Sequence, residues 1–168
     1  MSRQHFVTGS LVVVLAAACA QPEAAPDMAA IEQAIQAVRD QEIGGFSSGN
    51  IDQVLAVITP DVHMMPPNEP AVVGHDAARA WAQAIHAQFD VSGRYTSSNI
   101  IVAGDYVIER FTAELALTPK AGGAGMAETL KGIHIYQRQA DGSWKIIQDV
   151  WNSDAPPPAV PPTTTTGQ

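Results

Sequence analysis

The chain has 168 residues, of which 46% are apolar, and 9 basic against 17 acidic side chains give it a net charge of −8. This acidic balance argues against binding to nucleic acid and against charge-driven binding to anionic lipid. The single cysteine excludes an internal disulfide and a cysteine-rich structural zinc site.

The first segment, residues 1–18, has the pattern of a secretion signal. Arg3 gives it a positive start, and the apolar run that follows is too short to span a bilayer. Small residues lead into Cys19 and resemble the bacterial lipobox, which implies that this cysteine is acylated after the signal is removed. The alternative is an ordinary cleaved signal with an incidental cysteine. On the lipobox interpretation the chain is anchored through Cys19 alone, in the cell envelope on the periplasmic side of a bacterial membrane, and Ala20 favours the outer membrane.

Two short segments flank the predicted domain. Residues 19–26 are interpreted as the lipidated cysteine and a linker, and residues 155–168, which are rich in Pro and Thr, as a disordered tail. Residues 27–154 are long enough for one domain with a single core.

Apolar residues at spacings of three and four predict three helices in the first half of this domain. Asp27 is expected to cap the first helix and Asn50 the second, whose inner side extends to Ile58. The third helix is expected to begin at Gly74 and to bury a side that includes Phe89. A brief extended stretch lies between the second and third helices.

Beyond the third helix the apolar period changes from 3.6 to two, which is typical of strands. The strands are expected at 94–102, 105–117, 127–139 and 143–152. Gly and Asp residues between these runs indicate antiparallel hairpins. Helices followed by a meander indicate an α+β domain with its helices packed on one face of a curved sheet.

Several short sequence motifs, taken with their order along the chain, resemble those of a known family. They are Gly49-Asn50-Ile51-Asp52, Pro60-Asp61-Val62 with Pro66-Pro67, Gly74-His75-Asp76-Ala77, and Asp141-Gly142-Ser143-Trp144-Lys145 running to Asp149-Val150-Trp151-Asn152. Together they resemble the nuclear transport factor 2-like superfamily, which includes ketosteroid isomerase and the SnoaL-like polyketide cyclases. The resemblance covers residues 27–154. It implies a cone-shaped fold, with three N-terminal helices on a curved, mainly antiparallel sheet, and a homodimer formed through the sheet.

The same resemblance implies a ligand pocket between the sheet and the helices. Counting back from the Asp-Gly turn places His134 where ketosteroid isomerase keeps a protonated Asp, and counting forward places Trp151 at a pocket aromatic, with Asp149 beside it. The residues expected to line the pocket are Met64, Trp81, Tyr106, His134 and Trp151.

The isomerase reaction itself is not expected. Pro66 falls where the proton-shuttling Asp belongs, and Glu42 falls where the oxyanion-hole Tyr belongs. A proline cannot accept a proton, and an ionised glutamate repels an enolate. The catalytic positions of ketosteroid isomerase are therefore replaced.

His134, Glu42 and Asp149 remain as candidate catalytic residues. A carboxylate beside an imidazole can serve as an acid/base pair, or it can be a buried pair that only stabilises the fold. The other histidines, His63 and His75 among them, lack the close spacing of metal ligands, so we expect no metal and no cofactor.

Two functions fit these features. We favour a lipid-anchored domain that binds a small apolar or amphipathic molecule in the cone. The alternative is a cofactor-free SnoaL-like or ketosteroid isomerase-like enzyme that acts on a carbonyl compound through His134 and a carboxylate. A homodimer that binds a partner stays open as a third possibility.

Overall fold

The computed structural model describes residues 26–155. The predicted signal segment, Cys19 and all but the first residue of the predicted tail lie outside these residues. Within the described part of the chain, no helix is both long enough and apolar enough to cross a membrane.

Three helices occur where the apolar spacing predicts them. Helix α1 spans Met28–Ser48 and α2 spans Ile51–Val57, while α3 spans Gly74–Gln88. Both predicted N-caps are confirmed, because Asp27 Oδ1 accepts a hydrogen bond of 3.1 Å from the Ala30 N–H and Asn50 Oδ1 one of 3.3 Å from the Gln53 N–H.

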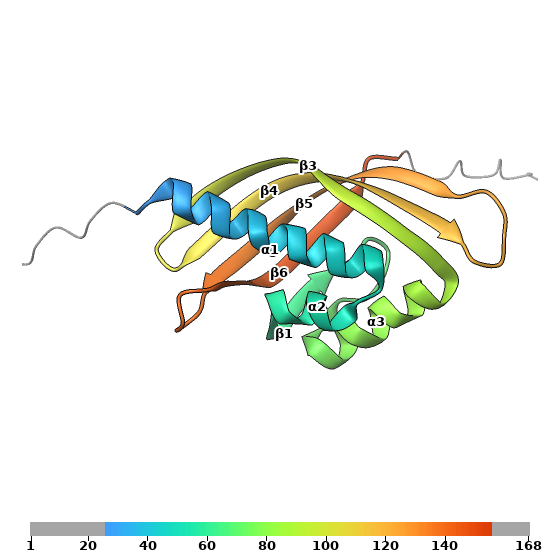
Figure 1. Cartoon of the computed structure of the whole chain (residues 1–168), viewed down its shortest axis with the longest axis horizontal. Helices are drawn as coiled ribbons and strands as arrows, with labels where there is room; N and C mark the ends of the chain where they lie inside the picture. Colours follow the sequence, from blue (N-terminus) through green and yellow to red (C-terminus); the bar gives the residue numbers. More distant parts are fainter. Residues whose placement is uncertain (1–25, 156–168) are drawn as a thin grey trace, which may run out of the picture.

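The strands form one curved sheet, and the helices lie on one side of it (Figure 1). They are β1 (Ile58–Met65), β2 (Val72–Val73), β3 (Phe89–Ala103), β4 (Tyr106–Pro119), β5 (Met126–Arg138) and β6 (Trp144–Ser153). Their order in the sheet is β2-β1-β6-β5-β4-β3, and only the β1–β6 pairing is parallel. The predicted α+β cone with a mainly antiparallel sheet is confirmed.

Two boundaries differ from the sequence-based expectation. Ile58 is not on the second helix but begins β1, where it pairs with Ile146 of β6. Phe89 is likewise not part of the third helix, since it begins β3 and pairs with Pro119. In both places the apolar residue fits the helical period but belongs to a strand, because a short apolar run is compatible with either structure.

Alternation along β5 decides which sheet residues face the helices. Leu130, His134 and Tyr136 are buried, whereas Ile133 on the opposite face is 42% exposed. Trp144 and Ile146 of β6 complete the core beneath α1 and α2. The inward face of the central strands is therefore the surface on which a site can be built.

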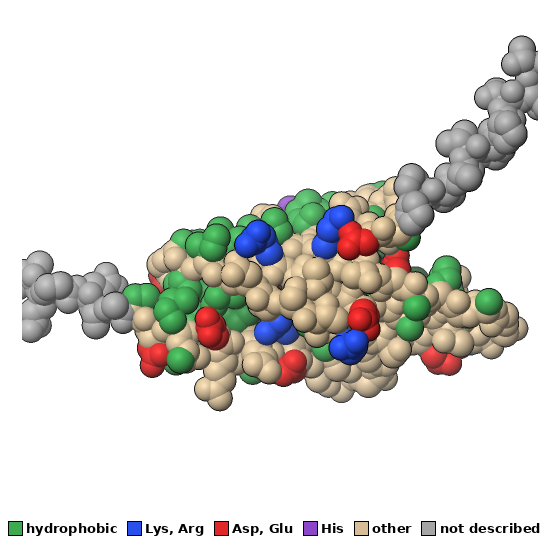
Figure 2. Space-filling view, turned by 90° about the horizontal axis from the view of Figure 1, so that it is seen from above, with side chains coloured by type: hydrophobic (Ala, Val, Ile, Leu, Met, Phe, Trp, Pro, Cys, Tyr) green, Lys and Arg blue, Asp and Glu red, His purple; other side chains and the backbone are tan. Residues whose placement is uncertain are grey.

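The outer surface shows no concentration of positive charge on the face drawn in Figure 2. Lys and Arg side chains are scattered there among Asp and Glu, and apolar side chains gather at the end where α1 begins.

Candidate functional site

A half-open cavity of about 250 Å³ lies between the helices and the inward face of the sheet. Met64, Trp81, His134 and Trp151 line it, as the resemblance implies. Pro66, which stands at the isomerase base position, is a buried part of the wall. Most of the remaining lining is aliphatic or aromatic, so the cavity suits an apolar molecule.

Three aromatic rings form one wall of this cavity. The Trp81 ring stacks on Phe46 with centroids 5.8 Å apart, and it meets Trp151 edge to face at 5.8 Å. Trp81 Nε1–H donates a hydrogen bond of 2.9 Å to Glu69 Oε2. These three contacts hold the Trp81 ring in place, so Trp81 both lines the cavity and packs against the hydrophobic core.

Tyr106 was predicted to line the pocket, and this prediction is wrong. Its side chain is 42% exposed, and its hydroxyl accepts a hydrogen bond of 3.3 Å from Gln137 Nε2, outside the cavity. The next residue, Val107, is fully buried, and neighbouring residues of a strand point to opposite faces. Tyr106 therefore lies on the outer face of the sheet.

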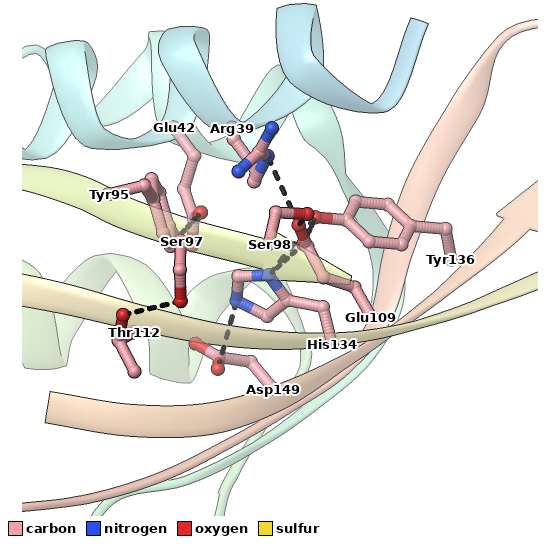
Figure 3. A network of polar contacts seen from close by, with 10 residues as sticks. All are labelled: Arg39, Glu42, Tyr95, Ser97, Ser98, Glu109, Thr112, His134, Tyr136 and Asp149. Carbon is pink, nitrogen blue, oxygen red and sulfur yellow. Dashed lines mark hydrogen bonds and ion pairs between the residues drawn. The ribbon is translucent and has the colours of Figure 1, made fainter. Parts of the chain in front are cut away.

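Glu109 of β4 forms a buried polar centre behind the cavity (Figure 3). It accepts hydrogen bonds from the hydroxyls of Tyr136, at 2.5 Å, and Ser98, and it lies 3.2 Å from Arg39 Nε. Burial would raise the pKa of Glu109, but the hydrogen bonds from His134, Ser98 and Tyr136 lower it. Glu109 is therefore an ionised carboxylate whose hydrogen-bonding capacity is filled.

His134 of β5 joins this centre to the cavity. Its Nδ1 lies 3.2 Å from Glu109 Oε2, and its Nε2 lies 3.1 Å from Asp149 Oδ1 of β6. Burial would lower the pKa of His134, but the charges of Asp149 and Glu42 outweigh burial and raise the pKa to about 10. The imidazole is therefore a cation at neutral pH, and both ring nitrogens carry protons.

The space around the His134 ring depends on a glycine. The Phe111 ring packs against it with centroids 4.3 Å apart. A Cβ at Gly132 would overlap the Phe111 ring and the Val150 carbonyl oxygen, so only glycine allows this close approach.

Glu42 reaches the cavity from α1. The Tyr95 hydroxyl donates it a hydrogen bond of 2.6 Å. Burial raises the pKa of Glu42 to about 7, against the opposing effect of the His134 charge. A carboxyl group that titrates near neutral pH can both give and take a proton.

The three candidate catalytic residues thus converge at the inner end of the cavity. Glu42, His134 and Asp149 each offer an atom, and these atoms lie within 4.8 Å of one another. A divalent cation could contact all three if His134 lost its proton, although no metal is expected from the sequence. Without one, the arrangement can polarise a carbonyl oxygen through His134 and exchange a proton through Glu42.

Sequence reasoning missed the residues that support this convergence. They are Arg39, Tyr95, Ser98, Glu109 and Tyr136. The sequence holds one signal for them, since Glu109 interrupts an apolar alternation along β4. His63, His75 and His86 do not line the cavity.

A protein-family model described as the SnoaL-like domain matches residues 40–147. The match spans more than half of the chain, so the chain belongs to the SnoaL-like domain family. A search of curated proteins finds no match.

Solved structures share the fold at low identity. A ketosteroid isomerase-like protein from Erwinia carotovora atroseptica SCRI1043 is 22% identical, with a TM-score of 0.65 over 74% of this chain and 96% of that one. A nuclear transport factor 2-like protein from Salmonella enterica serovar Typhimurium is 11% identical, with a TM-score of 0.70 over 83% and 99%. A proposed scytalone dehydratase from Novosphingobium aromaticivorans is 13% identical, with a TM-score of 0.70 over 76% and 86%. These similarities show that the chain shares the fold of these structures.

Proposed function

We propose that the domain binds a small, largely apolar molecule in its cone, with the polar end of that molecule at Glu42, His134 and Asp149. The observation that carries this proposal is the half-open cavity of about 250 Å³, whose walls are apolar and whose inner end is a buried polar cluster. An apolar wall favours burial of a hydrocarbon body, and a few convergent polar groups orient it.

Native mass spectrometry and thermal melting of the full chain test this proposal. We expect a bound molecule, or a rise in melting temperature with members of an amphiphile library. Trp81→Ala should weaken the ligand-induced rise, because it removes a cavity wall. Tyr106→Ala is the matched control and should leave the rise unchanged, since Tyr106 lies outside the cavity. A library that shifts the melting temperature of neither protein would contradict ligand binding.

A second candidate is a cofactor-free enzyme acting on a carbonyl compound. The observation in its favour is the pKa of Glu42, about 7, beside the protonated His134. In this reaction Glu42 would remove a proton next to the carbonyl, and His134 would donate a hydrogen bond to the developing oxyanion. Deuterium uptake by carbonyl compounds, followed by NMR, tests it. Uptake should be lost in Glu42→Gln; equal uptake by both proteins would exclude Glu42 as the base.

We also propose that the chain is a lipoprotein of the bacterial cell envelope, secreted by residues 1–18 and anchored through Cys19 on the periplasmic side. The lipobox-like run supports this, and Ala20 favours the outer membrane. Cys19→Ser should move the protein from the membrane fraction to the soluble fraction. Retention of this variant in membranes would contradict the anchor.

The outer face of the sheet supports a homodimer. Ile101, Ile108 and Ile133 are 57%, 36% and 42% exposed, and large apolar side chains on a sheet face favour covering by another surface. Ile133→Lys should convert the dimer to a monomer in sedimentation experiments, whereas Glu32→Lys on exposed α1 should not. A monomeric wild-type chain at micromolar concentration would contradict the dimer.

A further inference from the structure

The buried polar cluster is one positive charge short. It contains three carboxylates, Glu42, Glu109 and Asp149, but only two cations, Arg39 and His134. Burying a charge without a counter-charge is costly, so such clusters usually balance. The imbalance means that one carboxylate has no cation of its own.

Glu42 is that carboxylate. Glu109 lies 3.2 Å from both Arg39 and His134, and Asp149 lies 3.1 Å from His134. Among the described residues, Glu42 receives a hydrogen bond only from the neutral Tyr95 hydroxyl, at 2.6 Å. The charge deficit is therefore located at one named side chain, which lines the cavity.

Asp149, which lines the cavity, also has hydrogen-bonding capacity left. Its Oδ1 forms an ion pair with the Nε2 of His134 at 3.1 Å, but within the described residues neither of these buried atoms makes a well-aligned hydrogen bond. A buried acceptor that lacks a well-aligned hydrogen bond favours a donor brought in from outside. A donor placed between Glu42 and Asp149 would serve both carboxylates.

The other charged residues that line the cavity are also acidic. Glu69, Glu114 and Glu128 line it nearer to solvent, and no Lys or Arg is among its described lining residues. Glu114 is paired with Arg94 at 2.7 Å, so Glu69 and Glu128 carry the negative charge of this part. A cavity with low-dielectric walls and charges of one sign concentrates ligands of the opposite sign. The lining therefore favours entry of a cation over a neutral molecule or an anion.

The aromatic residues that line the cavity also favour one class of ligand. Trp81, Trp151 and Phe46 line the cavity, and aromatic rings can attract cations and also bury hydrocarbon. A divalent metal would supply positive charge but would leave these walls without an occupant. An organic cation fills both requirements.

We propose that the cone binds a small hydrophobic amine, whose ammonium group lies between Glu42 and Asp149 and whose apolar body packs against Trp81 and Trp151. This inference rests on the proposed function and names the class of its ligand. The ammonium supplies the missing positive charge, and its N–H groups donate to the two carboxylates.

A matched ligand series tests this on the full chain by isothermal titration calorimetry at pH 8. Each series contains an amine, an alcohol and a carboxylate that share the same apolar group. Three apolar groups are used: phenylpropyl, cyclohexylpropyl and naphthylmethyl. The amine should bind at least ten-fold more tightly than the alcohol, and the carboxylate should bind weakest. This comparison needs no variant, so it does not depend on the folding of a mutant.

Glu42→Gln then locates the effect. It should weaken amine binding about ten-fold more than it weakens alcohol binding, because it removes the charge and keeps the size of the side chain. Glu32→Gln makes the same change on the exposed side of α1 and should leave both affinities unchanged.

The outcomes separate this inference from the proposed function. Equal binding of amine and alcohol would overturn the inference and leave the proposed function standing. Tight binding of Zn²⁺ or Mn²⁺ that is lost in Glu42→Gln, without preference for amines, would assign the charge deficit to a metal and overturn the inference. Absence of binding by every member of all three series would contradict both.

Discussion

The two nitrogens of His134 face regions of opposite character. On the Nδ1 side, Glu109 is fully buried and receives hydrogen bonds from Tyr136 and Ser98 and an ion pair from Arg39. On the Nε2 side, the carboxylates of Glu42 and Asp149 line an open cavity and share fewer donors. A saturated network fixes a side chain, whereas an unsaturated one leaves binding capacity. The first region holds the imidazole and the second is where a ligand can act.

The largest effect is expected from breaking the saturated side. Glu109→Leu leaves Arg39 and His134 buried without their shared carboxylate, so it should lower the free energy of unfolding by about 3–5 kcal/mol. Urea denaturation measures this. Glu32→Leu, on the exposed side of α1, is the matched control and should change stability by less than about 0.5 kcal/mol. A small effect at Glu109 would mean that the network does not hold the fold.

A smaller effect on stability, which depends on pH, is expected from Glu42 on the cavity side. Because the pKa of Glu42 rises from its ordinary 4.5 to about 7, the folded state binds a proton that the unfolded state releases between these values. This contribution is present below pH 4.5 and is lost as pH rises through about 7. The loss is at most about 3 kcal/mol, at about 1.4 kcal/mol for each unit of pKa.

Denaturation between pH 5 and 8 measures this dependence. Glu42→Gln should flatten it, because no group titrates at that position. The raised pKa of His134 adds a loss only as pH rises from 6.5 through about 10, so the lower half of the interval reports on Glu42. A wild-type profile that is flat between pH 5 and 7 would contradict the burial of an unneutralised carboxylate.

The smallest effects come from two tyrosines that donate to carboxylates in the two regions. Tyr136→Phe removes a fully buried donor to Glu109 and should cost about 2 kcal/mol. Tyr95→Phe removes the donor to Glu42, where water can replace it from the cavity, and should cost less than about 1 kcal/mol. Urea denaturation compares the two variants, and equal costs would remove the distinction between the regions.

Local patterns predicted much of the fold and part of the site. Helix caps and the change of period are properties of neighbouring residues, which is why Asp27 and Asn50 were assigned correctly. His134 was placed in the pocket by the resemblance to ketosteroid isomerase, counted back from the Asp-Gly turn. Glu42 was identified because it falls at the oxyanion-hole position of ketosteroid isomerase.

Features that depend on contacts across the sheet were not predicted. Glu109 pairs with His134 across β4 and β5, and Arg39 reaches it from α1. No spacing in the sequence brings these three together. Tyr106 was misplaced for a related reason: a shift of one residue along a strand moves a side chain to the other face, and composition does not fix that parity.

The central claim is that Glu42 is a buried carboxylate without a cation of its own, facing the cavity. NMR titration of its side-chain carboxyl carbon, assigned by its absence in Glu42→Gln, tests this most directly. We expect a pKa of about 7 in the free protein, and a lower value when an amine is bound, because an ammonium stabilises the ionised form. A pKa near 4.5 that does not change with amine would contradict the account.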